Sequence, residues 1–174
     1  MNAEDPALQA GSYGIKATST LLPIVAERAM WWGEPWTDGS AALGTTSEGV
    51  TWAIGEGAEG LQAAEATFVL ITHPPAPYNG GIDNNAAPVR MTVAYEDGTH
   101  EEKVYDVPAN GRVTVRIGTD FPNSFDRRFS VLVESIGTSA PTGNPYVITV
   151  ESARYQSPGA FLDAGGAALA TKIK

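Results

Sequence analysis

The strongest constraint on the fold is a two-residue alternation of apolar and polar side chains. Apolar residues occupy every second position from Val89 to Tyr95 and again from Val113 to Ile117. This pattern is typical of strands that bury one face. Asp97-Gly98 and the turn sequence at 108–111 flank a further strand at 102–107, and Asp-Gly favours tight hairpin turns. We therefore expect a three-stranded antiparallel meander.

The rest of the chain also predicts strands rather than helices. Residues 66–72 (ATFVLIT) are apolar throughout and indicate a central strand covered on both faces, whereas residues 74–88 have no period and are expected to form a long polar loop. Further strands are predicted at 13–17, 24–30, 51–54, 129–135 and 146–155. The predicted fold is all-β, an antiparallel two-layer β-sandwich, immunoglobulin-like or related, with about eight to ten strands and no substantial helix.

Two parts of the chain match each other in order, spacing and residue type. Residues 27–31 (ERAMW) match residues 151–155 (ESARY) at an offset of 124, and residues 39–45 (GSAALGT) match residues 165–171 (GGAALAT) at an offset of 126. Such self-similarity indicates structural repetition. We expect residues 1–46 to be a leading hairpin segment, a partial copy, packed on a complete β-sandwich unit at 47–174. The two parts would form effectively one domain.

Composition excludes several classes of protein. The 20 acidic and 11 basic residues give a net charge of −9, which is the wrong sign for binding nucleic acid. The absence of cysteine removes disulfide scaffolds, thiol enzymes and cysteine zinc sites. No apolar run approaches the roughly 20 residues of a membrane-spanning helix. Residues 1–11 lack the apolar core of a secretory signal, so an export signal is expected outside this chain.

The order of several motifs resembles a known group of proteins. These are PIVAERAMWWG at 23–33, GSAALGTT at 39–46, TWAIGEG at 51–57, the ATFVLIT strand, YEDGT and YDVPANGRVTV at 105–115. From about Ile15 onward the chain resembles the tandem β-repeat modules, of unassigned function, of large secreted or cell-surface bacterial proteins. The resemblance implies an extracellular β-sandwich module that is not known to be catalytic. This sequence departs from the pattern in its longer loop at 74–88 and its degraded second copy.

The tryptophans suggest a ligand site. Trp31, Trp32, Trp36 and Trp52 lie close together in the sequence, and exposed aromatic rings can bind the faces of sugars. Adjacent strand residues point to opposite faces, and large aromatic side chains also fill sandwich cores. Core or inter-unit packing is the favoured interpretation, with Trp32 and Trp36 as the exposed pair if a carbohydrate is bound.

Other polar residues point to chemistry only weakly. Asp83, Asn84 and Asn85 could supply oxygen ligands to calcium, but the motif of a calcium loop is absent and a plain turn is favoured. His73 and His100 are expected on the surface, and no G-x-S-x-G nucleophile motif occurs. Glu27 recurs as Glu151, which predicts a structural partner such as Arg28, Arg112 or Arg116. No catalytic residue and no cofactor is predicted.

The function expected from the sequence is therefore non-catalytic. The chain would be a structural or adhesive module of a larger exported bacterial protein, located outside the cell or at its surface. Its partners would be neighbouring repeat modules or cell-surface components, with no nucleic acid and no membrane insertion. Two alternatives remain open: a carbohydrate-binding module that uses exposed tryptophans to hold a polysaccharide, and a self-assembling surface subunit that exchanges strands between molecules.

Overall fold

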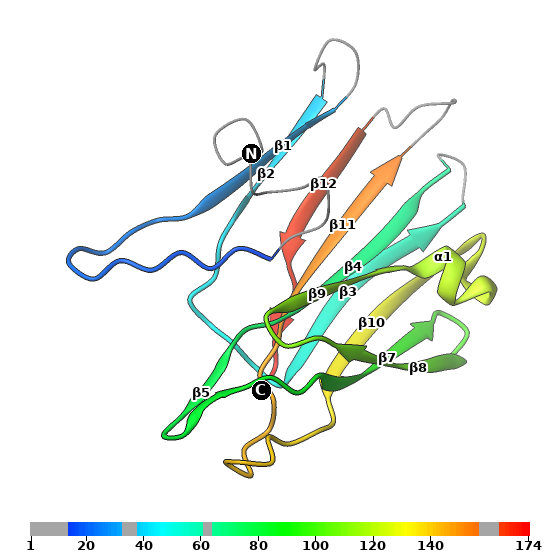
Figure 1. Cartoon of the computed structure of the whole chain (residues 1–174). Helices are drawn as coiled ribbons and strands as arrows, with labels where there is room; N and C mark the ends of the chain where they lie inside the picture. The colour runs from blue at the N-terminus through cyan, green and yellow to red at the C-terminus, as the bar shows by residue number, and fades with distance from the viewer. Residues whose placement is uncertain (1–13, 33–37, 61–63, 157–163) are drawn as a thin grey trace.

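Two antiparallel sheets pack face to face and form most of the molecule (Figure 1). The computed structural model describes residues 14–32, 38–60, 64–156 and 164–174. One sheet has the order β13 (Thr171–Lys172), β3 (Thr51–Glu59), β10 (Arg127–Ser135), β7 (Ala87–Tyr95) and β8 (His100–Val107). The other has the order β12 (Ala164–Leu169), β11 (Thr149–Gln156), β4 (Ala66–His73) and β9 (Gly111–Arg116). The prediction of an all-β sandwich is confirmed.

The core lies between the two sheets and follows the alternation in the sequence. In β7 the residues at odd positions from 87 to 95 are buried and the residues between them are more exposed. The prediction that β4 is covered on both faces is also confirmed, because Val69, Leu70 and Ile71 are all buried. Helical structure in the described ranges is limited to α1 (Ile117–Asp120) and the 3-10 turn η1 (Pro122–Ser124). This short segment crosses the end of the sandwich before β10.

The predicted meander is wrong in its last strand. β7 and β8 do pair across the Asp97-Gly98 turn, where Gly98 has a positive φ of 83°. β9, however, pairs with β4 in the opposite sheet, from His73 opposite Gly111 to Phe68 opposite Arg116. The turn at 108–111 therefore carries the chain from one sheet to the other. Alternation identifies a half-buried strand, but it does not identify the neighbour to which that strand is hydrogen-bonded.

Several further expectations need correction. The loop predicted at 74–88 contains a small hairpin of β5 (Ala76–Tyr78) and β6 (Gly81–Asp83). Residues 14–17 are not a strand. The strand β12 and the strand β2 (Asp38–Leu43) were not predicted as strands, because their glycine and alanine residues give no apolar alternation.

The matching segments of the sequence form two hairpins with the same register. β1 (Glu27–Trp32) pairs with β2 so that Glu27 faces Leu43. In the second hairpin, β11 pairs with β12 so that Glu151 faces Leu169. The five following pairs correspond in the same way, up to Trp32 with Asp38 and Gln156 with Ala164. The next backbone contact corresponds too, since the amide of Gly44 donates to the Ala26 carbonyl and that of Ala170 to the Val150 carbonyl.

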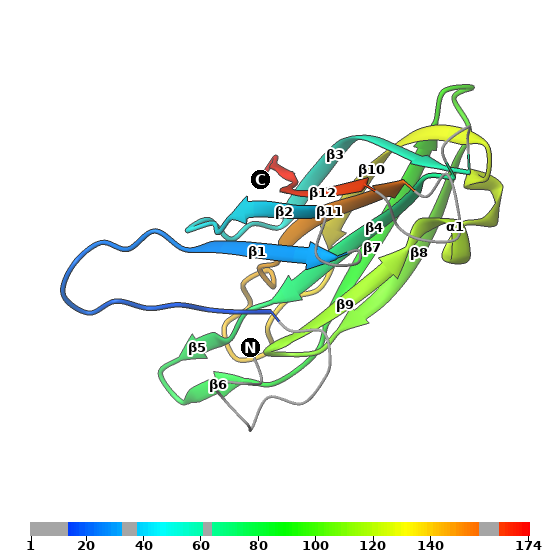
Figure 2. The same cartoon turned by 90° about the horizontal axis from the view of Figure 1, so that it is seen from above.

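The first hairpin lies against the second, and both views place β2 beside β12 (Figures 1 and 2). The amide of Ala167 donates to the Ser40 hydroxyl over 3.1 Å. Arg28 forms a salt bridge with Glu151 across the contact. The segment before β1, residues 14–26, runs out from the body as a long extended loop in both views. The hairpin thus packs on the complete sandwich as an addition to one of its sheets.

Candidate functional site

In the first hairpin, the exposed side chain of a tryptophan lies against a glycine of the opposite strand. Trp31 faces Gly39 across the hairpin, and a Cβ on Gly39 would come within 2.6 Å of the Trp31 ring. The ring therefore occupies the space beside the glycine, and Trp31 remains 65% exposed. The corresponding pair in the second hairpin is Tyr155 over Gly165, where the added Cβ would meet the tyrosine ring at 2.5 Å.

Trp31 and Trp52, the two tryptophans whose side chains the structure describes, have different environments. Trp31 is largely exposed and therefore does not fill the core of this chain, while the other part of the expectation from the sequence, packing between units, stays a prediction. Trp52 is in the core, and its indole nitrogen donates to the Ile148 carbonyl over 3.0 Å. Trp32 is the last residue of β1, next to Trp31. Trp36 lies outside the described residues, so the sugar-binding pair predicted from Trp32 and Trp36 stays a prediction.

A buried polar cluster closes the end of the sandwich near β5 and β6. The Asp83 carboxylate accepts hydrogen bonds from the hydroxyls of Ser139, over 2.6 Å, and Tyr146, over 3.2 Å. Its other oxygen accepts from the backbone and side-chain amides of Asn85, over 3.0 and 2.7 Å. Both oxygens of Asp83 are therefore in use, and a calcium ion would have to displace these donors. Asn84 and Asn85 are exposed at the surface beside it.

Hydrogen bonding and burial set the ionisation of this cluster. The Ser139 hydroxyl and the Asn85 amide lower the pKa of Asp83, which favours the carboxylate. Burial lowers the pKa of His73, whose ring packs edge-on against Tyr146 at 5.1 Å between centroids. The surface position expected for His73 is wrong, because the ring is fully buried. His100 is exposed at the start of β8. Because the cluster is enclosed, its arrangement suits a structural role in holding the β5–β6 hairpin to the sandwich rather than a role in binding a substrate.

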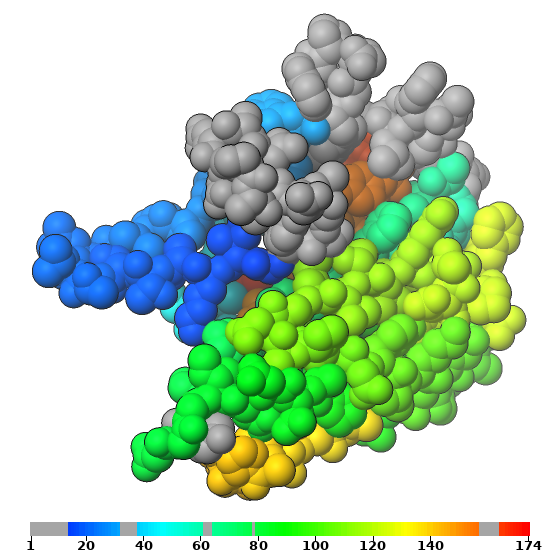
Figure 3. Space-filling model, viewed as in Figure 1, coloured from blue at the N-terminus to red at the C-terminus, as the bar shows by residue number. Residues whose placement is uncertain are grey.

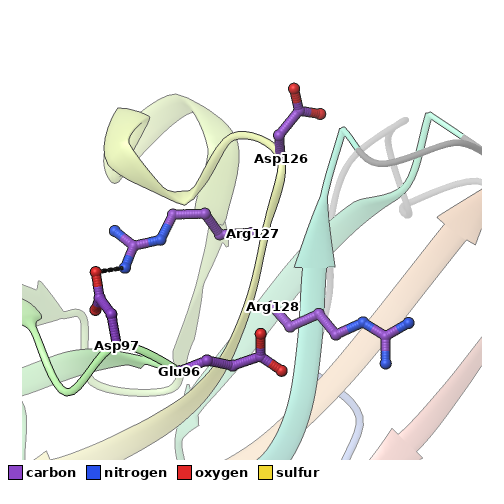
Figure 4. A pocket seen from close by; sticks show the side chains of 5 residues that line it. All are labelled: Glu96, Asp97, Asp126, Arg127 and Arg128. Atoms are coloured by element: carbon purple, nitrogen blue, oxygen red, sulfur yellow. Dashed lines mark ion pairs between the residues drawn. The ribbon is translucent and has the colours of Figure 1, made fainter.

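A shallow hollow lies between the β7–β8 turn and the start of β10 (Figure 4). Its volume of about 270 Å³ is below the range of roughly 300–1,000 Å³ of ligand pockets. Arg127 pairs with Asp97 over 2.5 Å and lies over the Tyr95 ring, 3.8 Å from its centroid. Figure 4 shows Arg128 and Asp126 directed away from that pair. These contacts fasten the hairpin turn to β10.

The contact between the hairpins contains a half-buried charge cluster. Burial is the largest influence on Glu151 and raises its pKa, while Arg28 and Arg112 oppose that rise. The predicted arginine partner of Glu151 is thus confirmed for Arg28. Glu27, its counterpart on the first hairpin, is exposed. The glutamate at this position is therefore half-buried in the second hairpin, as Glu151, and exposed in the first, as Glu27.

Within the described ranges, no three or more His, Cys, Asp or Glu side chains gather as they would around a metal ion. None of the helices placed by the structure is long and apolar enough to cross a membrane.

The described residues form an all-β sandwich, and one solved structure shares this fold. A Thermotoga maritima protein, described as "Thermotoga maritima 1070", aligns with a TM-score of 0.53 and 13% identity over 74% of this chain and 97% of that one. The Anabaena sensory rhodopsin transducer aligns with a TM-score of 0.42 and 22% identity over 62% of this chain and 97% of that one. No profile of a known protein family matches the chain, and no curated protein does.

Proposed function

We propose that this protein is a non-catalytic structural module of a larger exported bacterial protein, and that its two hairpins are copies of one repeat element. The observation that supports this function is the common register of the hairpins, from Glu27 with Leu43 and Glu151 with Leu169 onward. Repeat modules are stabilised by contacts with their neighbours. The half-buried pair of Arg28 and Glu151 is a contact of that kind.

The test is a chain in which residues 47–174 are followed directly by a second copy of residues 47–174. If the units are made to stack, the second unit docks on the β11–β12 hairpin of the first, on the side of β12 that β2 covers in the present chain. Calorimetry should then show one cooperative transition. The matched control joins the same two units through a long Gly/Ser linker, which separates them and should lower the unfolding temperature. If both versions unfold at the same temperature, as two independent units, the proposal is contradicted.

Carbohydrate binding is a second candidate because of one observation. The Trp31 ring lies against Gly39 and is largely exposed, and an exposed aromatic ring can hold the face of a sugar. Trp32 and Trp36 are the further candidates from the sequence. Titration of tryptophan fluorescence with a panel of polysaccharides tests this function. A shift that is lost in Trp31→Ala or Trp36→Ala supports it, and the absence of any shift removes it.

A further inference from the structure

The turn between β5 and β6 presents an asparagine followed by a glycine to solvent. Tyr78 pairs with Gly81, so Asn79 and Gly80 form a two-residue turn, and both are exposed. Figure 3 shows this hairpin, in green, projecting at the lower left of the molecule. The Gly80 amide takes part in none of the turn and loop hydrogen bonds between described residues. Exposed turns with few tertiary contacts change conformation readily, so the Asn79 side chain can reach the Gly80 nitrogen.

An asparagine side chain can react with the backbone amide that follows it. The Gly80 nitrogen, after it loses its proton to a base in water, attacks Cγ of Asn79 and forms a new C–N bond. The C–N bond of the side-chain amide then breaks, and ammonia leaves after taking a proton from water. Water opens the resulting succinimide at either carbonyl group and gives aspartate or isoaspartate. Glycine favours the attack because it has no Cβ to hinder the approach and its backbone is permissive.

The second Asn-Gly pair of the sequence is held in place by the fold. Asn110 has a positive φ of 55°, and the amide of Gly111 donates to the Pro108 carbonyl over 2.9 Å. Gly111 also begins β9, where it pairs with His73 of β4. The nitrogen that would attack Asn110 is therefore hydrogen-bonded and joined to a sheet. Reaction at Asn110 needs a local opening of the structure first.

The other described asparagines also lack a free glycine amide after them. The amide of Asn85, which follows Asn84, donates to the Asp83 carboxylate over 3.0 Å. The amide of Ser124, which follows Asn123, donates to the carbonyl three residues before it over 2.9 Å. Two asparagines are followed by alanine, which has a Cβ, and by proline, which has no amide proton: Asn85 and Asn144.

We propose that Asn79 is a site of spontaneous modification, at which deamidation through a succinimide with Gly80 gives aspartate and isoaspartate. Each product carries a negative charge where the amide was neutral, and isoaspartate adds a carbon atom to the backbone of the turn. A two-residue turn fixes the pairing of the strands beside it, so isoaspartate should weaken the pairing of β5 with β6. This inference rests on the turn alone and is independent of the proposed function.

Peptide mapping by mass spectrometry tests the site on the full chain. The protein is incubated at mildly alkaline pH, which favours the deprotonated nitrogen, and the peptide of each asparagine is followed with time. Asn79 should convert at least about tenfold faster than Asn110, because the Gly111 amide must first leave its hydrogen bond and its strand. An isoaspartate-specific methyltransferase should label the Asn79 peptide. No conversion at Asn79, or an equal rate at Asn110, would overturn the proposal.

The same measurement in urea separates the effect of the fold from that of the sequence. Asn79 and Asn110 both precede glycine, so their rates should become similar once the chain is unfolded. A rate difference that persists in urea would mean that the neighbouring sequence, and not the fold, selects Asn79, which contradicts the account given of Asn110.

Two matched glycine variants test the route of the reaction. Gly80→Ala should slow the conversion of Asn79 by about tenfold or more, since the added Cβ hinders the attacking nitrogen. Gly55→Ala is the control, because Gly55 is exposed and has open space around an added Cβ, and it should leave the rate unchanged. Undiminished conversion in Gly80→Ala would contradict the succinimide route. Hydrogen exchange in residues 76–83 should be faster in the converted protein, and equal exchange would contradict the weakened pairing.

Discussion

His73 and Asp83 show how a few buried polar residues fasten one end of the sandwich. Asp83 fastens the β5–β6 hairpin to Ser139 and Tyr146, and His73 packs against the same tyrosine. This cluster could not be predicted from the sequence, since Asp83 and Ser139 are 56 residues apart. The turn composition around Asp83 suggested a surface loop. Only the tertiary packing of two distant loops brings its carboxylate inside.

Acid should destabilise the protein in two stages. The folded-state pKa of His73 is below its ordinary value of 6.5, so the unfolded chain takes up the proton first. Stability should therefore fall as the pH decreases from about that value towards the folded pKa. The pKa of Asp83 is likewise below its ordinary value of 3.8, so the stability that its carboxylate contributes is lost below that pH. Urea unfolding at a series of pH values measures both stages. In the His73→Phe variant, the free energy of unfolding should no longer depend on pH in the upper stage. An unchanged pH dependence in that variant would contradict the assignment to His73.

Gly118 should tolerate no side chain, because the buried Glu59 occupies the space. The Glu59 carboxylate accepts the Thr67 amide over 2.8 Å, and a Cβ on Gly118 would lie 2.4 Å from its other oxygen. We expect Gly118→Ala to cost about 1–3 kcal/mol in the free energy of unfolding, as overpacking does. Gly55→Ala is the control, since nothing lies within 4 Å of the added carbon. Equal denaturation midpoints for the two variants would show that Glu59 is not fixed there.

At the scale of elements, the sequence predicted strands well where one face is apolar. β7 and β10 follow the alternation closely, because every second residue is buried over most of each strand. β2 and β12 were missed as strands because packing against a neighbouring hairpin favours small residues, which carry no hydrophobic period. Their equivalence was nevertheless visible as a match between 39–45 and 165–171. Self-similarity was therefore a better guide to these strands than hydropathy.

The two aromatic-on-glycine pairs should differ in their tolerance of a methyl group. The Tyr155 ring is held edge-on by Phe68 at 5.6 Å between centroids, whereas the Trp31 ring is largely in solvent and can move. Gly165→Ala should therefore cost about 1–3 kcal/mol, and Gly39→Ala less than about 1 kcal/mol. Chemical denaturation of both variants measures the difference. A larger loss for Gly39→Ala would mean that Trp31 is held as firmly as Tyr155.

For the whole molecule, the added hairpin should stabilise the sandwich on which it lies. Removal of residues 1–46 takes away the Arg28 partner of Glu151 and the Ser40 hydroxyl that accepts the Ala167 amide. The remaining chain, 47–174, should fold but unfold at a temperature lower by several degrees, since about 1 kcal/mol corresponds to roughly 4 °C in a domain of this size. Calorimetry of both chains measures the shift. An unchanged unfolding temperature would mean that the hairpin contributes no stability.

The central claim is that the chain is one complete sandwich preceded by a copy of its last hairpin. The most direct measurement is the set of cross-strand nuclear Overhauser effects in solution. We expect contacts between Ala29 and Ala41 to match those between Ala153 and Ala167, as the common register requires. A different register in the first hairpin, or no cross-strand contacts between residues 27–32 and 38–43, would contradict the account.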